Sequence, residues 1–189
     1  SLSPINTTSL AIMLPVINIM MANPESKQQL ISNGITKIIL FLLTTVQDEE
    51  LIEYLIEALT TLADKVNSVS ERVILKLTSL LRSPNPIIQK QVALIFCHIA
   101  GGQDNQRFIR EANAIFELIT LLQSPSDSVK CLAITALWKA TFENPANVIA
   151  FNKANGIAAM SKLLQSASRA VISQTLGILF DLANNPGCP

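Results

Sequence analysis

Charged residues are scarce in this chain. They make up 15% of its 189 residues, against about a quarter in ordinary soluble domains. The 14 basic and 14 acidic residues cancel, so the net charge is zero, which excludes the basic surface with which general nucleic-acid binders hold phosphates. Hydrophobic residues reach 49%, and so apolar a composition excludes intrinsic disorder. We therefore expect a folded chain with no nucleic-acid partner.

Cysteine and histidine are too few for the common catalytic and metal sites. The three cysteines, Cys97, Cys131 and Cys188, are odd in number and contain no CxxC pair, which excludes a disulfide framework and a zinc knuckle. They are typical of a reducing compartment, so we expect a cytoplasmic protein, with the nucleus as the alternative. The only histidine, His98, follows Cys97, but neighbouring helix residues point about 100° apart. We expect no catalytic residue, no metal and no cofactor.

Long hydrophobic runs are missing as well. A transmembrane helix needs roughly 20 apolar residues, and the longest candidates, Leu10–Met21 and Ile35–Leu43, are shorter and broken by polar residues. No basic segment precedes Leu10–Met21, as a signal peptide would require. We expect no direct insertion into a membrane. Gly101-Gly102 lacks the spacing of a phosphate-binding loop and indicates a turn between repeats.

The sequence contains an internal repeat of about 40 residues. An apolar pair ends a predicted helix in each copy, and its second residue is Leu42, Leu81, Leu122 or Leu164. Ser-Pro follows two of these pairs, where proline breaks the helix. An Asn and a small residue precede the same helix at 33–34, 113–114 and 155–156. These residues predict a corner at which two helices meet at a sharp angle.

The third helix of each repeat carries the clearest pattern. Its apolar residues recur at i, i+4, i+7, i+8, i+11 and i+12, which trace one wide face of an α-helix. One layer of this face consists of Leu59, Phe96, Leu137 and Leu179. A single unit cannot bury such a face, whereas stacked units bury it continuously. We therefore predict that these four side chains point away from water.

The pattern predicts one all-α domain over residues 1–189, made of a partial unit at 1–23 and four three-helix units at 24–64, 65–102, 103–143 and 144–186. Pro15 interrupts the first apolar stretch, so a helix there is kinked or begins near that proline. The unit at 65–102 lacks a glycine corner, and we expect it to fuse or lose its first helix around 69–79. Asn23-Pro24, Asn144-Pro145 and Asn185-Pro186 are interpreted as stop signals at unit boundaries.

The unit at 103–143 resembles the armadillo repeat. It begins with Asn105, turns at a small residue, Ala114, stops after Leu121-Leu122, and ends in an alanine-rich third helix at 129–141. HEAT repeats are the nearest rival, and the unit at 65–102 leans towards them. The armadillo resemblance implies a right-handed α-α superhelix, an armadillo-type solenoid whose partners lie along a groove lined by the third helices.

Nuclear-import adaptors of that family clamp a peptide backbone with an Asn near the end of the third helix, and carry a Trp one turn earlier. The corresponding Asn positions here hold Thr61, His98, Lys139 and Asp181, and the Trp positions hold Glu57, Leu94, Thr135 and Gly177. In the partial unit Asn18 holds the Asn position, but the four full units carry neither residue type, so we do not expect this chain to bind a classical basic localisation signal by that mechanism.

We predict a partner-binding groove lined by Glu53, Glu57, Thr61, Asp64, Leu94, His98, Thr135, Lys139 and Asp181. The acidic run that begins at Asp48 is interpreted as residues that stabilise the dipole at the start of a helix. The alternative is that Glu53, Glu57 and Asp64 form an acidic strip that faces a basic partner. For His98 a solvated side chain is favoured over a partner contact. For Trp138 packing between units is favoured over a solvent-facing binding residue.

No catalytic constellation accompanies the repeats, so we predict a non-enzymatic interaction module that binds a peptide or partner domain along the groove. The alternative is a regulatory arm of a larger multidomain protein, which restrains an attached domain or binds a small GTPase. Solenoids need polar outer faces on their terminal units, and the apolar residues at 10–14 and in the last helix do not supply them. We therefore expect a fragment of a longer protein, with the rest of the parent chain packed on one or both ends.

Overall fold

The computed structural model describes residues 6–66 and 68–184. Within these ranges the chain forms twelve α-helices and one 3-10 helix, and no strand. The chain divides into two compact units, Ser1–Lys65 and Val66–Pro189, and each is described by itself below. The predicted stop at Asn185-Pro186 and the third cysteine, Cys188, lie outside the described residues.

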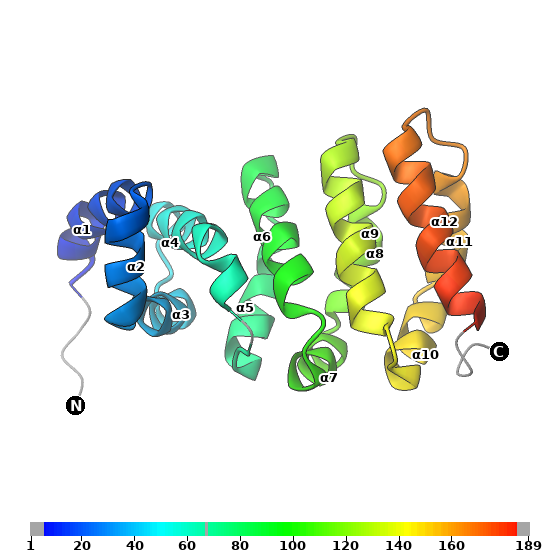
Figure 1. Ribbon diagram of the computed structural model, residues 1–189, viewed down its shortest axis with the longest axis horizontal. Helices are drawn as coiled ribbons and strands as arrows, with labels where there is room; N and C mark the ends of the chain where they lie inside the picture. Colours follow the sequence, from blue (N-terminus) through cyan, green and yellow to red (C-terminus); the bar gives the residue numbers. More distant parts are fainter. Residues whose placement is uncertain (1–5, 67, 185–189) are drawn as a thin grey trace. The chain divides into compact units, whose positions relative to one another are not determined.

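The first unit contains α1 (Thr7–Met21), α2 (Pro24–Ser32), α3 (Ile35–Thr45), α4 (Glu49–Thr61) and the 3-10 helix η1 (Ala63–Lys65). α1 packs on α4 and α2, and α3 packs on α4 (Figure 1). α1 runs through Pro15, so the prediction that a helix begins near this proline is wrong. The helix begins earlier because the Asn6 side chain accepts a hydrogen bond of 3.1 Å from the backbone N–H of Ser9 and caps it.

The second unit contains α5 (Glu71–Leu80), α6 (Pro86–Ile99), α7 (Gln103–Glu111), α8 (Ala114–Leu121), α9 (Asp127–Thr141), α10 (Pro145–Lys153), α11 (Gly156–Leu163) and α12 (Arg169–Asn184). The long helices α6, α9 and α12 lie side by side (Figure 1). The described residues between 65 and 102 form only two α-helices, α5 and α6, which agrees with the expected loss of a first helix there.

The predicted apolar face forms the core. Leu59, Phe96 and Leu137 are fully buried, as the periodicity predicts. Leu179, the fourth member of that layer, is half-buried. The structure therefore confirms the all-α class and the inward face of the long helices.

Buried asparagines join the short helices α7 and α10 to the ends of the long helices α6 and α9. Asn147 donates from its side-chain amide to the carbonyls of Ala140, at 2.7 Å, and of Gln106, at 3.0 Å. Asn105 donates to the carbonyl of Ile99 at 2.8 Å and accepts from the N–H of Val69 at 3.2 Å. Each amide thus satisfies a carbonyl that the end of α9 or α6 leaves without an intrahelical partner.

The Asn-Pro dipeptides start helices and do not stop them. Asn23 and Asn144 cap α2 and α10 with their side-chain oxygens, and the proline that follows is the first residue of each helix. Proline suits this position because its missing N–H would have no helical partner there. Their interpretation as stop signals was therefore wrong, although both lie between helices as predicted.

The predicted corners are present, but the residue that turns the chain differs. In the first unit it is Gly34, with φ of 82°, whereas in the second unit it is Asn113 and Asn155, with φ of 58° and 59°. Asparagine tolerates this left-handed conformation better than other residues with a side chain. The small residue after each asparagine begins the next helix.

Candidate functional site

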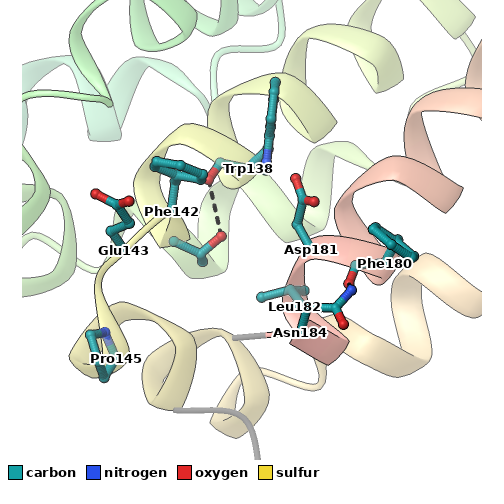
Figure 2. A pocket seen from close by; sticks show the side chains of 9 residues that line it. Trp138, Phe142, Glu143, Pro145, Phe180, Asp181, Leu182 and Asn184 are labelled. Carbon is teal, nitrogen blue, oxygen red and sulfur yellow. Dashed lines mark hydrogen bonds between the residues drawn. The ribbon is translucent and has the colours of Figure 1, made fainter. Parts of the chain in front are cut away.

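The candidate site lies over the C-terminal ends of α6, α9 and α12 in the second unit. One hollow, of about 620 Å³, lies between α6 and α9 and includes His98, Gln106, Trp138, Lys139 and Glu143 in its lining. We call it the α6–α9 hollow. The α9–α12 hollow, of about 650 Å³, includes Trp138, Phe142, Glu143, Phe180 and Asp181 (Figure 2). A smaller inner hollow of about 190 Å³ includes Thr135, Trp138, Gly177 and Asp181.

Trp138 lines all three hollows. Its side chain is 40% exposed and meets Phe142 edge to face, with the ring centroids 6.4 Å apart and the planes at 81°. The prediction that Trp138 packs between units is therefore wrong, and the solvent-facing alternative holds. One physical reason is Gly177 on the neighbouring helix, which lines the same inner hollow and has no side chain to cover the indole.

Hydrogen bonds fix the backbone beneath Trp138. The buried Gln106 donates from its side chain to the carbonyls of Lys139, at 2.9 Å, and Phe142, at 3.2 Å. Asn144 donates to the side-chain oxygen of Gln106 at 2.9 Å. This network joins the last turn of α9 to α7, so the backbone that carries the Trp138 side chain is held in place by hydrogen bonds.

The two large hollows differ in charge. Of the two, only the α9–α12 hollow includes Asp181 and the exposed ring of Phe180, whereas the exposed ring of Phe142 lines both. His98 and Lys139 line only the α6–α9 hollow. Glu143 lines both and adopts the left-handed conformation, with φ of 50°. The described residues give neither Asp181 nor Glu143 an ion-pair partner, so the α9–α12 hollow presents aromatic rings and carboxylates.

The predicted groove residues of the second unit are partly brought together. His98 and Lys139 share the α6–α9 hollow, and Thr135 and Asp181 share the inner hollow. Leu94 is half-buried on α6. Lys139 holds its ammonium at 2.7 Å from the carbonyl of Cys97. The Lys139 ammonium therefore caps the last turn of α6, and part of its hydrogen-bonding capacity is used within the protein.

In the first unit the predicted acidic strip is engaged with neighbouring side chains. Glu57 accepts a hydrogen bond of 2.9 Å from the side chain of Asn18. Asp64 forms ion pairs with Lys65, at 3.1 Å, and Lys27, at 3.9 Å, and the hydrogen bond from Lys65 lowers the pKa of this carboxyl. Glu53 and Thr61 are exposed on α4. The charge of Asp64 is thus compensated locally.

Phe142, Glu143 and Phe180 are among the residues of the site that were not predicted. Two signals in the sequence point to the rings. Phe142 lies four residues after Trp138, on the same side of the helix end. Phe180 occupies in α12 the repeat position that Trp138 occupies in α9, since Val171 and Val129 share one position. The left-handed turn that places Glu143 carries no such signal.

The adjacent Cys97 and His98 do not form a nucleophile and its base. Cys97 is buried, its sulfur lies 3.0 Å from the carbonyl of Leu132, and burial raises the pKa of its thiol to about 12. An activated cysteine has a lowered pKa. His98 is exposed on the helix surface. Among the described residues no group of three or more side chains is placed to hold a metal ion, and no helix is long and apolar enough to cross a bilayer.

No family model matches the chain, and no curated protein matches its sequence. Solved structures do match. A designed armadillo repeat protein in complex with the peptide (KR)4 is 22% identical, with 96% of this chain and 78% of that chain covered and a TM-score of 0.72.

Two further engineered structures agree with it. A computationally designed armadillo repeat protein for modular peptide recognition is 22% identical, with 95% and 78% covered and a TM-score of 0.77. An engineered protein, Northeast Structural Genomics Consortium target OR329, is 24% identical, with 89% and 70% covered and a TM-score of 0.70. The fold of this chain is therefore all-α and armadillo-like, which confirms the resemblance. The handedness of a superhelix, the number of repeats and the single-domain division stay predictions.

Proposed function

We propose that this armadillo-like chain binds an extended peptide segment of a partner protein over the ends of α6, α9 and α12. The observation that carries the proposal is the exposed Trp138 with a hollow on each side of it. Tryptophan dominates many binding surfaces because it covers a large area with few rotatable bonds. The backbone beneath it is already fixed by Gln106, so binding orders little of the protein.

The charges of the two hollows indicate which peptide fits. Aromatic rings with carboxylates attract a Lys or Arg side chain, and the α9–α12 hollow supplies both through Phe142, Asp181 and Glu143. The peptide (KR)4 in the designed relative is basic throughout. In this chain His98 and Lys139 line the neighbouring hollow, so we expect a peptide that is basic at one position only.

A peptide selection against the whole chain tests the proposal. Peptides from a random displayed library are selected on the wild type, and their dissociation constants are measured by fluorescence polarisation. We expect Trp138→Ala to weaken binding at least about tenfold, the effect of removing a central aromatic side chain. The matched control is Phe116→Ala on α8, an exposed aromatic residue outside the site, which leaves the affinity unchanged.

Two outcomes contradict the proposal: a selection that yields no binder, or selected peptides that bind Trp138→Ala as well as the wild type. Circular dichroism of each variant shows that the helices are retained. A regulatory role towards an attached domain or a small GTPase, and a cytoplasmic or nuclear location, stay predictions from the sequence.

A further inference from the structure

One apolar face of α11 and α12 is uncovered at positions that are covered one repeat earlier. Ile115, Leu122 and Ile134 are each 2% exposed, and α10 and α12 pack on the helices that carry them. Their counterparts Ile157, Leu164 and Leu176 are between 37% and 53% exposed. We call these three residues the α12 face. Its side chains match those that bind the next helices inside the unit, and among the described residues nothing covers them.

A second uncovered apolar face lies on α1 in the first unit. Ile12, Met13, Val16, Ile19 and Met20 are between 43% and 73% exposed, and α1 contains no charged residue. We call these five residues the α1 face. The helix buries Leu14 and Met21 and packs on α4, so the α1 face is the part of α1 that this packing leaves in water.

The same joint between long helices recurs within each unit. α6 packs on α9 and α9 on α12, and α1 packs on α4. α2 follows α1 as α7 follows α6 and α10 follows α9, so α1 holds the place of a long third helix. In such a joint each helix offers one side to the helix before it and the other to the helix after it. In α12 the side that would contact a following long helix is uncovered, and in α1 the side that would contact a preceding long helix is uncovered.

We propose that the α12 face of one copy binds the α1 face of a second copy. The two faces are the unmatched halves of a joint that the chain already forms, both are apolar, and α1 adds no charge that the contact would have to bury. Because the two faces differ, the contact is heterologous, and each bound copy leaves one face open for a further copy. This inference does not depend on the peptide site, since neither face includes Trp138.

Two single variants and their mixture test this inference. Ile19→Glu blocks the α1 face and Leu176→Glu blocks the α12 face, and both positions are exposed, so the fold tolerates the change. Sedimentation velocity over a concentration series gives the mass. We expect the wild type to exceed the monomer mass as concentration rises, and each variant alone to need at least about ten times the concentration. In an equal mixture, the intact faces pair and the mass stops at the dimer.

The matched control is Ile149→Glu on α10, an exposed isoleucine outside both faces, which associates like the wild type. The milder pair Ile19→Ser and Leu176→Ser replaces the first pair if circular dichroism shows lost helix. A wild type that stays monomeric overturns the proposal. So does a mixture that shows no dimer, or one variant that associates as strongly as the wild type, because a heterologous contact needs both faces.

Discussion

Two glycines of the second unit have opposite surroundings. Gly156 begins α11, and a Cβ there would overlap the ring of the buried Phe151. Gly177 lies within α12, with nothing within 4 Å of the place of a Cβ. Glycine inside a helix costs about 0.5–1 kcal/mol relative to alanine. Whether a Gly→Ala substitution raises or lowers the free energy of unfolding therefore depends on the space available for the added Cβ.

We expect Gly156→Ala to lower the free energy of unfolding by about 1–3 kcal/mol, the usual cost of overpacking a filled core. Gly177→Ala, the matched control, is expected to raise it by about 0.5–1 kcal/mol. Urea unfolding followed by circular dichroism measures both. Equal stability of the two variants would show that Phe151 moves aside at little cost.

Burial on the long helices was predictable for most positions of the apolar face, whereas the exposure of Trp138 was not. Leu59 and Leu137 occupy fixed positions in a period of 3.6 residues, and this period determines which side of a helix is covered. Trp138 lies at the border of that face, where exposure depends on the neighbouring helix. Gly177 on α12 leaves its indole open, and a pattern within one helix carries no information about that neighbour.

The elements of the second unit are joined by buried amides as well as by apolar contact. The side chain of Asn147 donates to two carbonyls of other elements and accepts a hydrogen bond of 2.8 Å from Arg110. We expect Asn147→Ala to lower the free energy of unfolding by about 2–3 kcal/mol, since buried carbonyls then lose their donor. Guanidinium or urea titration measures the loss.

The control for this joint is Asn184→Ala. Asn184 is exposed, and its side chain donates only to the carbonyl of Phe180 in its own helix. A surface change of this kind is worth at most about 0.5 kcal/mol. If the two alanine variants lose the same stability, the amide of Asn147 does not join the elements.

Helix positions followed from the sequence more reliably than helix starts. The loss of a first helix at 65–102 was predictable because no corner residue precedes α5. Of the two outcomes expected at Pro15, a kink or a helix start, the helix start is wrong because α1 begins well before this proline with a capping asparagine. The sequence alone does not assign a role to Asn23 and Asn144, because a loop residue between two helices can end one helix or cap the next. Only the side-chain hydrogen bonds distinguish the two roles.

On the scale of the whole molecule, the division into two compact units predicts two unfolding steps. The first unit is the smaller one, and a short segment buries a smaller fraction of its surface on folding. It also leaves the α1 face in water. We therefore expect it to unfold at a lower urea concentration than the second unit.

The only tryptophan, Trp138, lies in the second unit, and this placement makes the prediction measurable. Circular dichroism reports the helices of both units, whereas tryptophan fluorescence reports the second alone. We expect the helix signal to begin to fall before the fluorescence changes. Asn147→Ala is expected to lower the fluorescence midpoint by roughly 1 M urea and to leave the first step unmoved. Coincident transitions would instead indicate one cooperative domain over residues 1–189, because two units that unfold together respond to every probe at the same urea concentration.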